Sequence, residues 1–76
     1  MDHERLRLLI QRKLRDGRLP HDRATQVWGG PSDGETCAAC DTVLTTAQLV
    51  MEGTTRGRHL QFHVQCFQLW DDERRN

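Results

Sequence analysis

The three cysteines of this chain fall into two short motifs, and these motifs constrain its fold more than any other feature. Two of them form a C-x-x-C pair, and the third belongs to an H-x-x-C pair. Three thiolates and one imidazole make a complete tetrahedral ligand set for a structural zinc ion. Because no cysteine is left over, the sequence predicts one zinc ion per chain, bound by Cys37, Cys40, His63 and Cys66.

The length of 76 residues is enough for one domain with a small hydrophobic core. A core of that size usually needs a metal ion or disulfides for stability. Three cysteines cannot all pair with one another, so a disulfide framework is disfavoured. No segment is apolar enough to cross a bilayer, so no membrane contact is expected. We expect one cytoplasmic domain over residues 1–76. The reducing environment of the cytoplasm would keep its thiols free to bind metal.

Residues 2–16 have the pattern of an amphipathic helix. Charged residues surround four apolar residues that recur at helical spacing, which are Leu6, Leu9, Ile10 and Leu14. Asp2 is suited to the N-cap, and Gly17 follows where a helix commonly ends in the left-handed conformation. We expect residues 1–23 to form this helix and the turn behind it.

Residues 24–36 are expected to connect this helix to the cysteine motifs. The stretch Gly29–Gly34 is rich in glycine, proline, serine and aspartate, which indicates turns rather than regular structure. Trp28 stands just before it. Because Trp is usually largely buried, we expect Trp28 to pack back on the zinc-binding part, with an exposed partner contact as the alternative.

Residues 37–74 have the order of a zinc-binding unit. The C-x-x-C pair predicts a tight knuckle, and short apolar runs predict a β-hairpin over roughly residues 48–62 with its turn in residues 53–57. A final helix is expected from about His63 to Arg74. The predicted fold is therefore a small α+β domain: an N-terminal helix, a knuckle, a hairpin and a C-terminal helix. Its core is expected to contain Leu6, Leu9, Ile10, Leu14, Val50, Phe62, Phe67 and Trp70.

This order of elements resembles that of a treble-clef zinc finger. The string Phe62–Phe67 is also similar to the first zinc module of LIM domains, in which an aromatic residue precedes H-x-x-C and Phe follows it. The resemblance covers about residues 36–71. It departs from LIM because no second ligand quartet follows, residues 41–62 are longer than usual, and Asp41 stands where Gly is often found. The whole chain resembles a family of short, uncharacterised bacterial proteins ending in H-x-x-C-F-x-x-W, which implies zinc binding and no particular activity.

A second ligand set remains open at this point. His59 lies four residues before His63, so a quartet resembling a C2H2 finger can be written as Cys37, Cys40, His59 and His63. That set would leave Cys66 unused, and residues 41–58 are longer than the usual finger allows. The Cys3His set is therefore favoured. His59 itself is interpreted as an exposed strand residue. The alternative is that it lies next to the metal ligands and supports them without binding the metal itself.

Four protein ligands leave no open position for water or substrate, and the sequence contains no catalytic constellation or phosphate-binding loop. We therefore expect a non-catalytic zinc module that acts through a protein partner and has no small-molecule substrate. Residues 1–23 carry a net charge of +3 and residues 24–55 a net charge of −4, although the whole chain is neutral. The expected partner surface is arginine-rich, comprising Arg5, Arg12, Arg15, Arg56 and Arg58.

Nucleic-acid binding through the basic N-terminal helix is the alternative function. Its arginines would contact phosphates, and such binding would weaken steeply with salt. No aromatic residues are interleaved with the arginines to stack on bases, so this alternative is less favoured.

Overall fold

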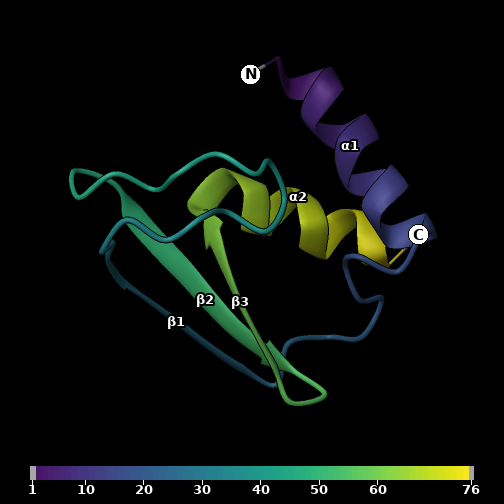
Figure 1. Cartoon of the computed structure of the whole chain (residues 1–76). Helices are drawn as coiled ribbons and strands as arrows, with labels where there is room; N and C mark the ends of the chain where they lie inside the picture. Colours follow the sequence, from purple (N-terminus) through teal and green to yellow (C-terminus); the bar gives the residue numbers. More distant parts are fainter. Residues whose placement is uncertain (1, 76) are drawn as a thin grey trace.

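The computed structural model describes residues 2–75 as two helices and a three-stranded antiparallel sheet (Figure 1). The elements follow in the order α1 (His3–Arg15), β1 (Gln26–Pro31), β2 (Leu49–Thr55), β3 (Arg58–His63) and α2 (Val64–Arg74). Neither of these helices is long and apolar enough to traverse a membrane. The two helices and the antiparallel sheet confirm the predicted α+β class.

Helix α1 forms where the periodicity of the sequence predicted it. Its buried side includes Leu6, Ile10 and Leu14. The helix ends before Gly17, whose φ of +85° is the left-handed conformation that glycine adopts without a steric cost. Asp2 is the N-cap residue, as expected, but its side chain makes no capping hydrogen bond; its backbone carbonyl accepts from the Leu6 N–H at 3.0 Å.

Strands β2 and β3 form the predicted hairpin. Their last paired residues are Thr55 and Arg58, which leaves a two-residue loop of Arg56 and Gly57. Both loop residues have positive φ, 50° and 79°, as the type I′ turns that suit the twist of a hairpin require. The turn is shorter than expected, because Gly53 is paired within β2.

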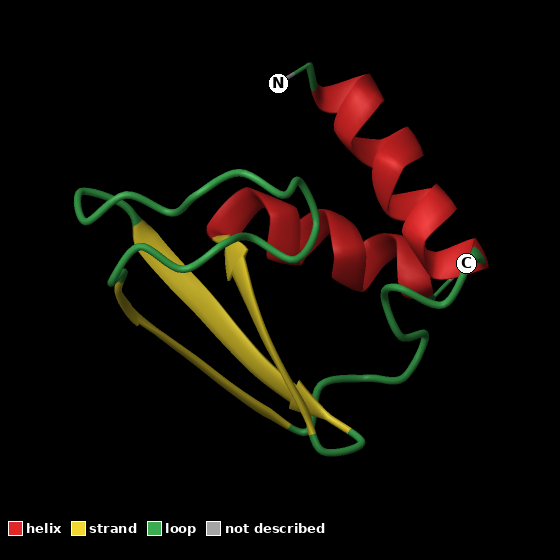
Figure 2. Ribbon diagram, in the orientation of Figure 1, coloured by secondary structure: helices red, strands yellow, loops and turns green. Residues whose placement is uncertain are grey.

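The connector predicted over residues 24–36 contains a strand, so its interpretation as a loop is wrong in part. Strand β1 pairs antiparallel with β2 from Gln26↔Thr54 to Pro31↔Leu49 and forms one edge of the sheet (Figure 2). An edge strand tolerates proline, since one row of its backbone groups needs no partner. At Gly29 the strands approach closely: a Cβ there would lie 3.3 Å from the Met51 sulfur.

An aromatic cluster packs helix α2 against one face of the sheet. Phe62 of β3 stacks on Trp70 at 5.1 Å between ring centroids, and Phe67 meets both rings edge-on at 5.7 Å. The Trp70 indole N–H also donates to the Pro20 carbonyl at 3.0 Å. This bond fixes the segment behind α1 to α2, so both helices belong to one core.

Candidate metal centre

The structure brings together the four residues that the sequence singled out as metal ligands. Their donor atoms all lie within 4.8 Å of one another: the sulfurs of Cys37, Cys40 and Cys66 and a ring nitrogen of His63. The C-x-x-C pair lies in the loop between β1 and β2, whereas His63 ends β3 and Cys66 lies in the first turn of α2. Two segments distant in sequence thus meet at one point.

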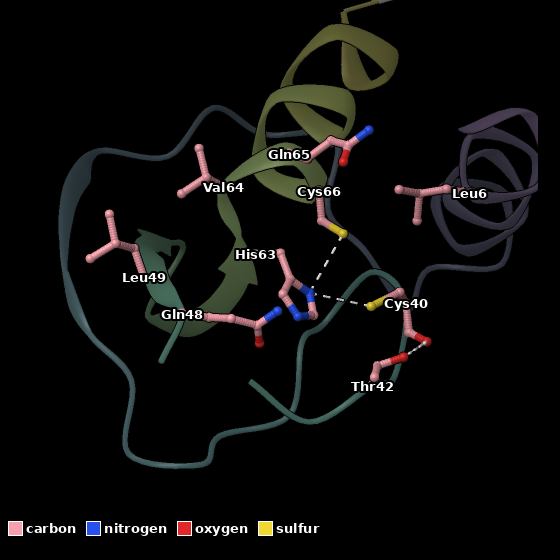
Figure 3. A pocket seen from close by; sticks show the side chains of 9 residues that line it. All are labelled: Leu6, Cys40, Thr42, Gln48, Leu49, His63, Val64, Gln65 and Cys66. Atoms are coloured by element: carbon pink, nitrogen blue, oxygen red, sulfur yellow. Dashed lines mark hydrogen bonds between the residues drawn. The ribbon is translucent and has the colours of Figure 1, made fainter. Parts of the chain in front are cut away.

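The imidazole of His63 faces the sulfurs through its Nδ1 atom. This nitrogen lies 3.4 Å from the Cys40 sulfur and 3.8 Å from the Cys66 sulfur (Figure 3). The other ring nitrogen is directed away from both sulfurs. Nδ1 is therefore the atom that would complete a set of three sulfurs and one nitrogen.

A tight turn presents the two cysteines of the C-x-x-C pair on the same side. The Asp41 N–H donates to the Cys37 carbonyl, and the Cys37 N–H donates to the Thr42 carbonyl, both at 3.0 Å. Asp41 has a φ of 63°, a left-handed conformation that aspartate tolerates better than most residues. The Ala38 N–H donates to the Gln61 carbonyl at 2.8 Å, which fixes this knuckle, residues 37–41, beside β3.

The cluster has a buried side and an open side. Cys37 and Cys66 belong to the hydrophobic core, whereas Cys40 and His63 are half-buried. The open side faces a hollow of about 540 Å³ between α1 and the start of α2 (Figure 3). Its apolar lining includes Leu6, Leu49 and Val64. A metal ion could therefore enter without unfolding the core.

The two buried thiols share a proton in the absence of metal. A hydrogen bond from Cys66 lowers the pKa of the Cys37 thiol to about 4. The same bond, together with burial, raises the pKa of the Cys66 thiol. The shared hydrogen bond thus favours one thiolate and one thiol within the Cys37–Cys66 pair.

Lys13 connects helix α1 to the knuckle. Its side chain is only 3% exposed, and its ammonium donates to the Ala38 carbonyl at 2.9 Å and to the Asp41 carboxylate at 2.7 Å. A buried ammonium is costly unless it is paired and hydrogen-bonded, so both acceptors are needed. Sequence reasoning counted Lys13 only as one basic residue among several. The available signal was its position, since it stands seven residues after Leu6 and three after Ile10, on the apolar side of the helix.

The second ligand set considered for this chain is not formed. His59 lies on β3 outside the group of potential ligands, with its Nε2 3.6 Å from a Glu52 carboxylate oxygen. Its ring centroid is 5.4 Å from that of Trp28. Trp28 therefore contacts the zinc-binding part as expected, but the expectation that it is buried is wrong, because its side chain remains exposed on β1. Nothing in its local sequence distinguishes an exposed Trp from a buried one.

The five arginines expected to contact a partner separate into two sets. Arg5, Arg12 and Arg15 are exposed on α1 and form no ion pair within residues 2–75. At the hairpin, Arg56 pairs with Asp22 at 3.1 Å and Arg58 donates to the Arg18 carbonyl at 2.9 Å. Only the set on α1 is therefore free of such contacts in the part of the chain described.

No protein-family model, curated protein or solved structure matches this chain. The chemistry of the site is therefore inferred from its own residues and distances. Three sulfurs and one imidazole nitrogen can hold a metal ion that accepts soft ligands, and all three cysteines are free of disulfides.

The contact between α1 and the knuckle can be tested with Asp41→Asn. We expect the free energy of unfolding to fall by about 1–3 kcal/mol, because the buried Lys13 ammonium loses its counter-charge. Asn tolerates the left-handed conformation, so the backbone itself is not strained by the change. Urea denaturation provides the measurement, and Asp33→Asn, at an exposed loop position, is the matched control. Equal stability of the two variants would show that the ion pair contributes nothing.

Metal uptake should release protons near pH 7. The hydrogen bond between Cys37 and Cys66 keeps a proton on one thiol of the pair, and this proton must leave before both sulfurs can act as thiolate ligands. We therefore expect at least one proton per bound ion, and an affinity that already falls as the pH is lowered below 7. A metal titration in weak buffer with an indicator dye measures this directly. Binding without proton release would contradict the assigned protonation.

Proposed function

We propose that the candidate centre holds one Zn²⁺ and that the chain is a zinc-dependent recognition module of the treble-clef type. The observation that carries the proposal is the approach of three sulfurs and one imidazole nitrogen to within 4.8 Å of one another. Zinc is typically held in this tetrahedral combination in structural sites. The knuckle before the hairpin and the helix after it follow the treble-clef order, with α1 and β1 as additions.

The proposed role of zinc is structural rather than catalytic. Catalytic zinc sites keep three protein ligands and an open position for water or substrate, whereas four protein donors close the sphere. Two of the four donors, Cys37 and Cys66, lie in the hydrophobic core. Zinc there would join the knuckle to the β3–α2 junction and lower the entropy cost of closing the intervening chain.

The proposed activity is binding of a protein partner through the exposed arginines of α1. Arg5, Arg12 and Arg15 carry charges that no acidic side chain within residues 2–75 neutralises by an ion pair. The acidic middle of the chain and its net charge of zero make a nucleic-acid partner the weaker alternative. We therefore expect an acidic protein surface as the complement of α1.

Replacement of single ligands tests the zinc proposal. His63→Gln and Cys66→Ser should lose the bound zinc and the cooperative thermal transition, because zinc binding contributes on the order of 10 kcal/mol in small zinc domains. His59→Gln is the matched control and should keep one zinc per chain and its transition. Metal analysis and circular dichroism provide the readouts. A folded, zinc-free His63→Gln protein, or zinc loss from His59→Gln, would contradict the proposed ligand set.

The partner proposal is tested by capture with two variants of equal charge change. A triple substitution of Arg5, Arg12 and Arg15 to Gln should lose the captured partner, whereas Arg56→Gln with Arg58→Gln and Arg18→Gln should retain it. Zinc content and the thermal transition should be unchanged in both variants. A partner retained by the first variant would contradict the surface. A captured species that nuclease destroys, and that dissociates steeply with salt, would establish nucleic-acid binding instead.

A further inference from the structure

The sheet has one face that helix α2 leaves uncovered. Alternation along the strands places Trp28, Glu52 and Gln61 in one row across this face, and His59 in the next row. The opposite face carries Phe62 and packs on α2 through the aromatic cluster. The uncovered face is therefore a surface whose side chains are available to another molecule.

Trp28 is the largest exposed apolar side chain on this face. It stands on the edge strand β1, and 45% of its surface is accessible. The nearest ring is that of His59, at 5.4 Å between centroids and tilted by 40°, so the indole is not enclosed between aromatic neighbours. A Trp left this exposed presents an electron-rich ring face to solvent, which attracts cations.

Glu52 places a carboxylate beside this indole. Its register partner on β1 is Trp28, and its side chain is only 18% exposed. The one basic group within 4 Å of it among residues 2–75 is the His59 ring, whose Nε2 lies 3.6 Å away. That distance exceeds the roughly 3 Å of a hydrogen bond. The Glu52 carboxylate thus lacks a close cationic donor within the described chain.

The Glu52 carboxylate is the one formally charged group on strands β1 and β2. Strand β3 adds Arg58, which alternates with His59 and so belongs to the opposite face. An indole face next to a carboxylate complements a cation rather than an anion. A guanidinium fits both groups, because it stacks flat on an aromatic ring and donates paired hydrogen bonds to a carboxylate.

We propose that Trp28, Glu52 and His59, here called the Trp28 surface, bind an arginine side chain of a partner protein. The guanidinium lies on the indole and takes Glu52 as its counter-ion, and His59 forms the border of the site. This surface shares no residue with the arginines of α1 or with the candidate metal ligands, although alternation along β3 places His63 on the same face, in the row next to Gln61. The module consequently presents a cation-binding surface on its sheet in addition to a cationic surface on its first helix.

The test uses the zinc-loaded full chain and three fluorescently labelled peptides, (Gly-Arg)4, (Gly-Lys)4 and (Gly-Glu)4. Fluorescence anisotropy at low salt should show that (Gly-Arg)4 binds at least about threefold more tightly than (Gly-Lys)4. Binding of (Gly-Glu)4 to the arginines of α1 should be the same in the unchanged chain and in Trp28→Ala, because that peptide does not use the Trp28 surface. Trp28→Ala and Glu52→Gln should each weaken (Gly-Arg)4 binding at least about threefold. Leu8→Ala and Glu4→Gln remove equivalent exposed groups from α1 and should leave binding unchanged.

Intrinsic fluorescence gives an independent readout. Trp70 is fully buried and Trp28 is exposed, so a change in the emission of the more solvent-exposed indole on peptide addition reports on the Trp28 surface. Equal binding of the arginine and lysine peptides, or full binding by Glu52→Gln, would overturn the inference. Zinc content is measured on each sample. Zinc-loaded protein that fails to bind (Gly-Arg)4 contradicts this surface alone, whereas failure to bind zinc contradicts the proposed function alone.

Discussion

The fold depends on holding the knuckle against the junction of β3 and α2. These segments are separated by the whole hairpin, yet the donor atoms of Cys37 and Cys66 lie within one cluster and both residues belong to the hydrophobic core. The cluster is therefore continuous with the packing around Phe62 and Trp70. A change at Cys37 or Cys66 therefore acts on the core directly, because these two residues also fill the interior.

The first helix depends on the same knuckle. Its apolar side packs into the core, and the Lys13 ammonium donates two hydrogen bonds to the knuckle, which carries Cys37 and Cys40. Trp70 then holds the segment after α1 through the Pro20 carbonyl. Lys13 and the apolar side of α1 thus join the helix that carries Arg5, Arg12 and Arg15 to the part of the fold that holds the potential ligands.

Sequence reasoning identified the elements whose signals are local. The helical spacing of apolar residues from Leu6 to Leu14 predicted α1. Apolar alternation predicted the hairpin, and helical spacing predicted α2. Strand β1 was missed because its pairing is decided by β2, which lies far along the chain, while its own glycines and proline indicate turns. The burial of Lys13 had a local signal in its position on the apolar side of α1, but its two acceptors lie in the knuckle and could not be predicted from the helix alone.

Six of the eight residues predicted for the core are buried: Leu6, Ile10, Leu14, Val50, Phe62 and Trp70. Leu9 and Phe67 are only half-buried, whereas the core also contains Leu19, Leu44, Leu60 and Leu69.

Zinc K-edge X-ray absorption of the loaded protein is the most direct test of the central claim, which is that Cys37, Cys40, His63 and Cys66 form a closed structural zinc centre. The expected spectrum shows three sulfur ligands at about 2.3 Å and one nitrogen at about 2.0 Å. A shell containing oxygen, or fewer than three sulfurs, would contradict a closed structural centre formed by these four residues.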